Sequence, residues 1–498
     1  EQTKRCSLLD KVTHVYCKDF TLADLGQPNS GPTDDTTRTA DISIFRSTVS
    51  LWPERPSISA PAHHPRRTGG RTWPSASEQQ RSLMTLIHYQ NNELFIENVP
   101  AKSLAEQFDT PLYVYSQGTI TAAYKAFCQA FENHPVMICY AVKANANLGV
   151  LSLLARLGAG FDIVSGGELE RVLRAGGDPG KVVFSGVGKQ DWEIRKALTA
   201  GIACFNIESS MELDQIQGLA HSMDLIAPIS VRVNPDVDAG THPYISTGLR
   251  ENKFGVSMED APGLYQRARD LSHIETKGID CHIGSQITEL APFMDAMSRV
   301  LSLVDDLAIA GINLAHIDLG GGLGVCYEDE TPVDILEYAG AILQGMGHRP
   351  QTLVFEPGRY LTANAGILLT RVVNIKTNED KHFAIVDAGM NDLIRPALYQ
   401  SWQRITEVEV RNSAKQRFEV VGPICETGDF LGKNRSLAIE AGDLLAIHSV
   451  GAYGFAMSSN YNSRNRAAEV IVSGETTQCV RQRETIDDQL RLEHCLVL

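Results

Sequence analysis

The sequence predicts a (β/α)8 barrel of the TIM type followed by a second, mostly antiparallel β domain. From about residue 112, eight short apolar runs alternate with segments of helical period. After about residue 365 this rhythm gives way to short β-type runs separated by Gly, Asn and Asp. Apolar strands alternating with amphipathic helices indicate a parallel sheet covered on both faces, and eight such units favour a closed barrel. An open doubly wound sheet is the alternative.

The predicted barrel strands are, in chain order, PVMICYAV, GFDIV, VVFSG, IACFNI, PISVRVN, GIDCHIG, LAHIDLG and TLVFEPG. Helical patterns such as NLGVLSLLARLG, GELERVLRAG and PVDILEYAGAILQGMG lie between them. The runs predicted for the β domain are ILLTRVVNIKT, KHFAIVDAG, QRFEVVGPI and DLLAIHSV. The alternating stretch LIHYQNNELFIENV, which precedes the barrel, is expected to join this β domain.

The N-terminal stretch differs from the rest of the chain. Residues 1–83 are rich in Ser, Thr, Pro and Arg, lack periodicity and contain no methionine before Met84. Two explanations stay open: a translated upstream region with the natural start at Met84, or a disordered extension. The expected division is 1–83 as this extension, 84–116 as a segment joining the β domain, 117–365 as the barrel and 366–498 as the β domain.

Composition narrows the class of partner. The formal net charge of −15 argues against nucleic acid or an anionic membrane surface, because both require clustered Lys and Arg. The ten cysteines form no Cys-x-x-Cys pair, so we expect no metal site and a reducing, cytoplasmic location. No apolar run approaches the roughly 20 residues of a membrane span. A small-molecule substrate therefore fits best.

The carboxyl ends of the predicted barrel strands carry the residues of interest, because barrel chemistry sits at that face. The first strand ends in Lys143 and the second in Asp162 and Ser165. The sixth, seventh and eighth strands end in His282 and Ser285, in Gly320, Gly321 and Gly322, and in Glu356 and Arg359.

These residue types suit pyridoxal phosphate. A desolvated lysine with a depressed pKa can form a Schiff base with an aldehyde, and a glycine loop after strand seven offers backbone N–H groups to a phosphate. A carboxylate at Glu356 can keep the pyridine nitrogen protonated, and the His282 imidazole can stack on the ring. Each feature has a plainer explanation: a strand-end lysine reaching solvent, a tight turn, a rim ion pair of Glu356 with Arg359, and a core histidine.

Six motifs in order along the chain resemble the diaminopimelate decarboxylase family of alanine-racemase-like, fold-type III pyridoxal-phosphate enzymes. They are YAVKANAN, HIGSQI, DLGGGLG, EPGRYL, CETGDFL and GAYGFAMSSNYNSRNRAAEV. The resemblance runs from about Met84 to the C-terminal end, and residues 1–83 lie outside it. It implies decarboxylation of meso-2,6-diaminopimelate to L-lysine, the last step of lysine biosynthesis.

The resemblance also implies roles for single residues. Lys143 would bind the cofactor covalently, His282 would stack on its ring and Glu356 would face its pyridine nitrogen. The remaining cofactor-binding residues would be Asp162, Ser285, Gly320, Gly321, Gly322, Pro357, Gly358, Arg359 and Tyr453. The distal end of the substrate would contact Arg359, Arg395, Tyr399, Glu426 and Tyr453. Cys425 would be the proton donor, delivered by the second subunit of a homodimer. Thr427 stands where the family more often has Ser.

Other functions are weighed against this one. A racemase of the same barrel class would usually place arginine against the pyridine nitrogen, so Glu356 speaks against it. A single-barrel carrier of the cofactor would lack the β domain with Cys425 and Tyr453, and a regulatory homologue without catalysis should have lost Lys143 or Cys425. A decarboxylase of the ornithine, arginine or carboxynorspermidine type stays the nearest alternative.

Overall fold

The computed structural model describes residues 86–238 and 252–497, and their central element is a closed barrel of eight parallel strands. The expectations for residues 1–83 and for Met84 lie outside the described residues. The barrel strands are β5 (Val136–Ala141), β6 (Gly160–Ile163), β7 (Val182–Phe184), β8 (Cys204–Ile207), β9 (Ala227–Asn234), β11 (Ile274–Asp280), β12 (His316–Asp318) and β13 (Thr352–Phe355). Because β13 pairs with β5 and β8 pairs with β9, the ring has no open edge. The predicted barrel is confirmed, and the open sheet is wrong.

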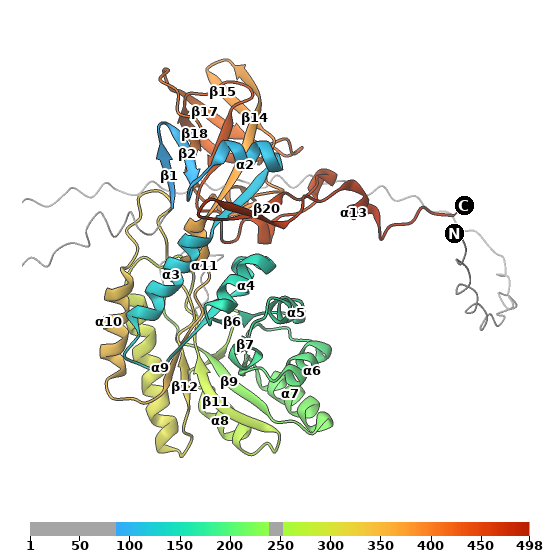
Figure 1. The fold of residues 1–498 in the computed structure, drawn as a ribbon. Helices are drawn as coiled ribbons and strands as arrows, with labels where there is room; N and C mark the ends of the chain where they lie inside the picture. Colours follow the sequence, from blue (N-terminus) through green and yellow to red (C-terminus); the bar gives the residue numbers. More distant parts are fainter. Residues whose placement is uncertain (1–85, 239–251, 498) are drawn as a thin grey trace, which may run out of the picture. The chain divides into compact units, whose positions relative to one another are not determined.

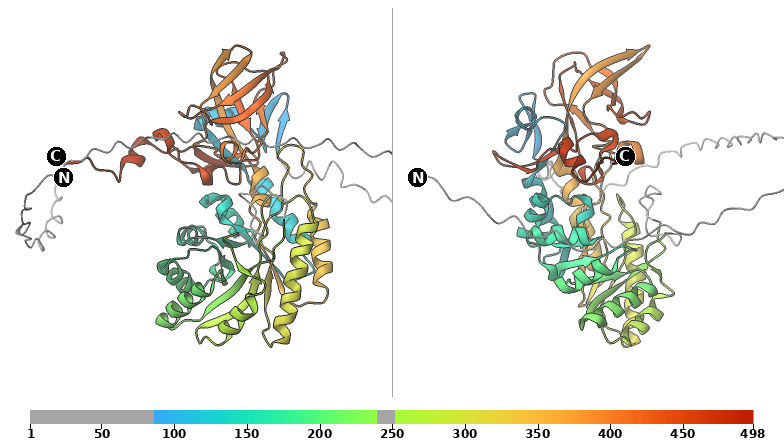
Figure 2. Two further views of the ribbon diagram at one scale, coloured as in Figure 1. Left: turned by 180° about the vertical axis from the view of Figure 1, so that it is seen from behind. Right: turned by 90° about the vertical axis from the view of Figure 1, so that its right-hand side faces the viewer.

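Helices alternate with the strands along the chain and cover the outside of the barrel (Figures 1 and 2). They are α3 (Gln117–Ala130), α4 (Leu148–Arg156), α5 (Gly166–Arg174), α6 (Asp191–Ala200), α7 (Ser210–Met223), α8 (Ala261–Arg269), α9 (Ala291–Ile309) and α10 (Ile335–Met346). Side chains cap several N-termini: Ser165 accepts from Glu168 N, and Ser209 accepts from Glu212 N. Ser165, predicted as a residue of the barrel mouth, thus serves as a helix cap.

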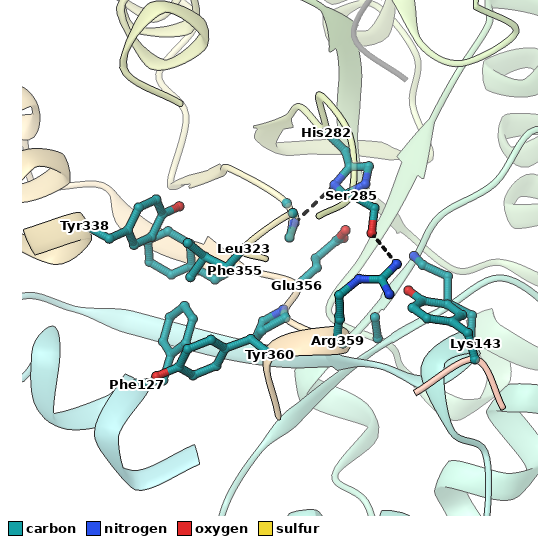
Figure 3. Close-up of a pocket in the computed structure, with 17 residues that line it drawn as sticks. Phe127, Lys143, His282, Ser285, Leu323, Tyr338, Phe355, Glu356, Arg359 and Tyr360 are labelled. Atoms are coloured by element: carbon teal, nitrogen blue, oxygen red, sulfur yellow. Dashed lines mark hydrogen bonds between the residues drawn. The ribbon is translucent and has the colours of Figure 1, made fainter. Parts of the chain in front are cut away.

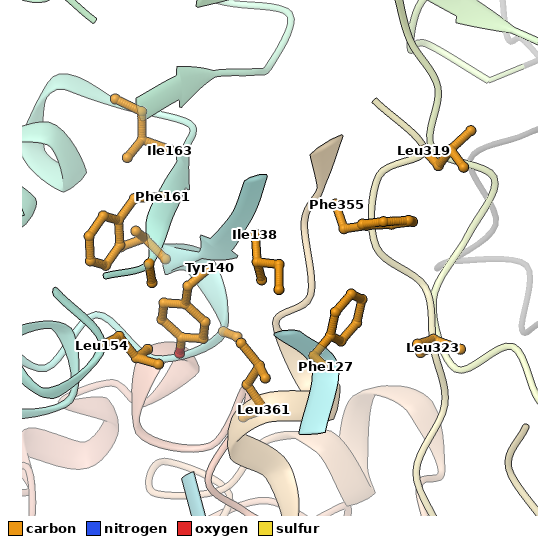
Figure 4. Close-up of a cluster of buried hydrophobic side chains, with 14 of the residues drawn as sticks. Phe127, Ile138, Tyr140, Leu154, Phe161, Ile163, Leu319, Leu323, Phe355 and Leu361 are labelled. Atoms are coloured by element: carbon orange, nitrogen blue, oxygen red, sulfur yellow. The ribbon is translucent and has the colours of Figure 1, made fainter. Parts of the chain in front are cut away.

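Aromatic and aliphatic side chains fill the space between the strands and the helices that cover them (Figure 4). Phe127 on α3 and Phe355 on β13 pack edge to face with ring centroids 5.4 Å apart. Strands β5 to β8 are almost wholly buried, which explains why their sequences read as continuous apolar runs. This packing fixes the carboxyl ends of the strands, where the site is built.

A second, mostly antiparallel sheet follows the barrel in sequence. Its strands are β4 (Leu112–Ser116), β14 (Gly366–Asn378), β15 (Lys381–Val386), β16 (Ile405–Glu407), β17 (Gln416–Val421), β18 (Phe430–Leu437), β19 (Leu444–Ile447), β20 (Ala468–Ser473) and β21 (Thr476–Arg481). Only the pairs β4 with β20 and β15 with β17 are parallel among its described pairs. Although β4 precedes the barrel in the chain, it lies between β14 and β20.

The N-terminal alternating run forms a small sheet of its own, made of β1 (Ile87–Gln90), β2 (Glu93–Ile96) and β3 (Val99–Pro100). Helix α2 (Ala101–Phe108) follows it. The sheet is tied to the segment after β16, because Leu94 N donates to Val408 O and Val410 N donates to Asn92 O, each at 2.8 Å. The run therefore contacts the β domain without entering its main sheet.

Within the described ranges, no helix combines the length and apolar character needed to cross a membrane. Cys139, Cys281 and Cys425 are free thiols. The cytoplasmic location stays a prediction.

Candidate active site

A cavity with an empty volume of about 510 Å³ opens at the carboxyl ends of the barrel strands (Figure 3). Most of the residues predicted from strand ends and motifs line it: Lys143, His282, Ser285, Gly320, Gly321, Gly322, Glu356, Pro357, Gly358, Arg359 and Tyr453. Phe127, Tyr338, Phe355 and Tyr360 add aromatic walls. This lining, in which aromatic walls surround a few convergent polar groups, is that of a site for a small organic molecule.

Lys143 lies in a 3-10 turn, η1 (Val142–Ala144), directly after β5. The two asparagines that follow hold this turn in place. The Asn145 amide donates to Gly451 O at 3.1 Å, and the Asn147 amide donates to the Glu469 carboxylate at 2.8 Å. Tyr453 N donates to Ala144 O at 2.8 Å. The run KANAN thus ties the lysine turn to the segment that carries Tyr453.

The Lys143 ammonium donates to the Asp162 carboxylate at 2.6 Å. Desolvation alone would lower the pKa of Lys143, but the charges of Asp162 and Glu356 outweigh it and raise this pKa above its usual range. The expectation of a depressed pKa is therefore wrong for the chain by itself, because the sequence does not show how many carboxylates surround the amine.

The glycine loop passes between two other chain segments. A Cβ added to Gly321 would lie 2.4 Å from Glu356 O, and one added to Gly320 would lie 2.6 Å from Cys281 O. Gly320 also has a φ of +66°, which favours glycine. Gly321 N donates to His282 Nδ1 at 3.2 Å, so this ring nitrogen is the acceptor. Burial, with Arg232 and Lys143 nearby, holds the pKa of His282 well below its usual value, and the imidazole is neutral.

Three buried carboxyl groups meet beneath the cavity. Oxygens of Asp280, Asp318 and Glu356 lie within 4.8 Å of one another. Burial and the neighbouring carboxylates raise the pKa of Glu356 and of Asp318 well above their usual values. The Glu356 carboxylate also accepts from Ser185 Oγ and Asn206 Nδ2, each at 3.4 Å. Asp280 and Asp318 are not among the predicted residues, although each is the last residue of a barrel strand, β11 and β12.

Two arginines lie side by side without a carboxylate partner. Arg359, at the start of α11 (Arg359–Thr362), and Arg395, at the start of α12 (Arg395–Tyr399), are both buried. Neither forms an ion pair with any residue that the structure describes, and the Nε atom of each is buried without a hydrogen-bond partner. Aromatic rings face them instead: the Arg359 Cζ lies 4.9 Å from the Tyr453 ring centroid, and the Arg395 Cζ lies 5.3 Å from that of Tyr399.

The site also includes Tyr327, which was not predicted. Its hydroxyl accepts from Arg359 Nη1 at 2.5 Å. Only its position shortly after the glycine loop could have pointed to it.

Two predicted residues lie elsewhere. Cys425 and Glu426 do not line the cavity, and both are exposed. Cys425 N donates to Asn462 Oδ1 at 2.9 Å, and the Tyr461 hydroxyl donates to the Glu426 carboxylate. Within this single chain they are not brought together with Lys143.

Comparison with known proteins identifies the family. Residues 117–363 match the pyridoxal binding domain of pyridoxal-dependent decarboxylases. Diaminopimelate decarboxylase of Pseudomonas aeruginosa is 59% identical over 405 residues, which cover 81% of this chain and 98% of that protein. The chain belongs to the diaminopimelate decarboxylase family. The Vibrio cholerae member is 56% identical over 415 residues, covering 83% of this chain and 100% of that protein.

A solved structure of the family has the same fold. Diaminopimelate decarboxylase from Helicobacter pylori, crystallised with L-lysine, has a TM-score of 0.77 and 43% identity, covering 79% of this chain and 98% of that one. The cofactor of these decarboxylases fits the cavity of this family member. A lysine amine, a loop of three glycines and a buried carboxyl group reach the same space, and they are the groups that an aldehyde, a phosphate and a pyridine nitrogen require.

Proposed function

We propose that this protein removes one carboxylate of meso-2,6-diaminopimelate, at the D-configured carbon, to give L-lysine and carbon dioxide. The single observation that carries the choice of substrate is the buried pair Arg359 and Arg395, which has no carboxylate partner in the part of the chain described. Two uncompensated guanidinium groups are costly to bury unless a ligand supplies the anion. The distal carboxylate of diaminopimelate is such an anion, and ornithine has none.

The cavity residues would hold pyridoxal phosphate. Lys143 would bind it covalently, and Glu356 would face the pyridine nitrogen. His282 would lie against the ring. Ser285, the glycines at 320–322 and the backbone of residues 356–359 would bind the phosphate, with Asp162 holding the lysine amine. When bound, the cofactor supplies an electron sink for the charge left on the carbon that loses its carboxylate.

The distal end of the substrate would be bound by residues around the arginine pair. Arg359 and Arg395 would bind the carboxylate, because planar guanidinium groups suit two-point contact with it. Tyr399 and Tyr453 cover the two arginines and would exclude water from that contact. Glu426 would bind the distal ammonium.

We further propose a homodimer in which Cys425 and Glu426 of one subunit complete the site of the other. Their exposure, on a chain whose cavity lacks both, supports this arrangement. Cys425 would then deliver the proton that replaces the lost carboxylate.

The decisive experiment measures carbon dioxide release from meso-diaminopimelate, ornithine, arginine and carboxynorspermidine by the purified holoenzyme. We expect kcat/KM for diaminopimelate to exceed that for ornithine by at least about a hundredfold. Ornithine would leave the buried arginine pair without its anion, and such unpaired groups disfavour binding of an analogue. A preference for ornithine would overturn the substrate assignment. No release from any of them, with the cofactor bound, would favour the non-catalytic alternative.

A further inference from the structure

Tyr327 contacts both Arg359 and Arg395. It follows β12 and the glycine loop, and it is 9% exposed. Its hydroxyl oxygen accepts from Arg359 Nη1 at 2.5 Å, while Ser285 Oγ accepts from Nη2 of the same guanidinium at 3.0 Å (Figure 3 shows the second contact). The Arg395 Cζ lies 5.9 Å from the Tyr327 ring centroid. A single side chain thus contacts both guanidinium groups.

The loop that carries Tyr327 is fixed from two sides. The Gln286 amide binds the Val325 backbone twice, donating to its carbonyl at 2.6 Å and accepting from its N–H at 3.1 Å. Downstream, the Glu330 carboxylate accepts from Tyr327 N and Glu328 N, both at 2.8 Å. The phenol is therefore held in place before any ligand arrives, which lowers the entropy lost on binding.

The hydroxyl of Tyr327 has a second capacity. Its oxygen already accepts from Arg359, and no described residue accepts its hydrogen. Its ring faces both guanidinium groups, with the centroid 5.7 Å from the Arg359 Cζ and 5.9 Å from the Arg395 Cζ, and the face of an aromatic ring attracts such cations. A phenol placed in this way orients Arg359 and can donate to the same anion that the arginines bind.

We propose that Tyr327 is a positioning residue that sets the preference for substrates with a distal carboxylate by holding Arg359 and Arg395 in the binding geometry. This inference rests on the proposed function and adds to it a residue outside the cavity lining. It predicts that loss of the hydroxyl weakens only ligands that carry the distal carboxylate.

The test compares two ligands on the holoenzyme of Tyr327→Phe. Meso-diaminopimelate has the distal carboxylate, whereas D-lysine keeps the reacting centre and the distal ammonium but lacks that carboxylate. We expect KM for diaminopimelate to rise about tenfold, as for loss of a hydrogen bond to a charged group, with kcat, the cofactor absorbance and the dissociation constant of D-lysine little changed. Tyr265→Phe is the matched control, because it removes a buried hydroxyl that donates to Gly278 O at 2.8 Å in the barrel wall.

A second variant moves the phenol without removing it. Glu330→Ala releases the backbone of the loop and should raise KM for diaminopimelate in the same direction by a smaller factor. An unchanged KM in both variants, or equal weakening of both ligands, would overturn the inference while carbon dioxide release by the wild type upholds the proposed function. If the wild type does not act on diaminopimelate, both fail.

Discussion

The ammonium of Lys143 donates to the carboxylate of Asp162 at 2.6 Å, and this carboxylate is fully buried. The pair places a cation at the point where a neutral amine must attack an aldehyde. Because Asp162 and Glu356 raise the pKa of Lys143, most of the amine is protonated at neutral pH before the cofactor binds. The amine must therefore lose its proton before it can attack an aldehyde.

Asp162→Asn should change the pH dependence of cofactor attachment. Removal of the negative charge lowers the pKa of Lys143, so the neutral fraction of the amine at a given pH increases. We expect attachment to the apoprotein at pH 8 to become about tenfold faster, one pKa unit being a factor of ten, with the profile displaced to lower pH. The measurement is absorbance near ~420 nm followed by borohydride reduction and peptide mapping.

Lys143→Ala is the control for that labelling and should leave no reduced adduct. Lys102→Ala changes an exposed lysine and should not alter labelling. A pH profile that stays the same in Asp162→Asn would contradict the assigned electrostatics.

Asp318→Asn should reduce the loss of stability that the apoprotein shows as pH rises. Burial first, and then neighbouring carboxylates, raise the pKa of Asp318 and of Glu356 above their values in the unfolded chain. Such groups bind more protons in the folded state, so their contribution to stability is greatest below about pH 4 and declines as pH rises through the raised pKa. The asparagine removes one of these groups and keeps an oxygen to accept from Gly320 N, as Asp318 does at 2.8 Å.

The quantity to measure is the free energy of unfolding by urea at pH 5 and pH 8. From pH 5 to pH 8, the free energy of unfolding of the variant, relative to that of the wild type, should increase by about 1–2 kcal/mol. The pKa of His282 is lowered, so its contribution to the free energy of unfolding decreases as pH falls, the opposite dependence. Both proteins contain His282, and its contribution cancels in the difference between them. An equal change in the free energy of unfolding between pH 5 and pH 8 in the two proteins would refute the role assigned to this carboxyl cluster.

Much of this fold could be predicted because each level of the sequence points the same way. Buried parallel strands leave continuous apolar runs, and the residue that closes each run must lie at one rim of the barrel. Lys143, His282, Gly320 and Glu356 could be placed together on this basis alone, and they line one cavity. The motifs of the family added Arg395 and Tyr453, which no periodicity locates.

Other features of the site depend on distances between side chains, and a sequence pattern does not contain these distances. The raised pKa of Lys143 arises from the combined charge of Asp162 and Glu356, and the sequence gives no measure of their approach. Tyr327 follows the glycine loop by only a few residues, yet its contact with both arginines depends on how Gln286 and Glu330 fold the loop back. That the early alternating run belongs to the β domain stays a prediction. Side-chain alternation does not specify which strands pair, and in the structure the run forms a small sheet of its own.

Arg395→Lys should impair use of diaminopimelate without loss of the cofactor. Lysine keeps the charge but offers a single ammonium where a planar guanidinium makes two-point contact. We expect kcat/KM for diaminopimelate to fall about 10- to 100-fold, as for loss of a charged hydrogen bond, with absorbance near ~420 nm retained. Arg417→Lys, on an exposed strand position, is the matched control. Equal kinetics in the two variants would exclude Arg395 from the substrate site.

Mixed dimers test whether the sites are shared between subunits. Cys425→Ala should leave the cofactor bound, because the thiol is exposed on its own chain and absent from its own cavity. It should lower kcat severely, because Cys425 is the proposed proton donor. Lys143→Ala should be inactive for a different reason, the loss of the attachment point.

If the partner supplies Cys425, a dimer of one variant with the other contains one site with both changes and one site with neither. Random exchange of equal amounts should then restore about a quarter of the wild-type activity, because half the dimers are mixed and each has one intact site of two. Activity measured before and after refolding the two inactive proteins together gives this fraction, and the same treatment of either variant alone is the control. No recovery, with mixed dimers verified by differently tagged subunits, would place Cys425 in the site of its own chain and refute the shared arrangement.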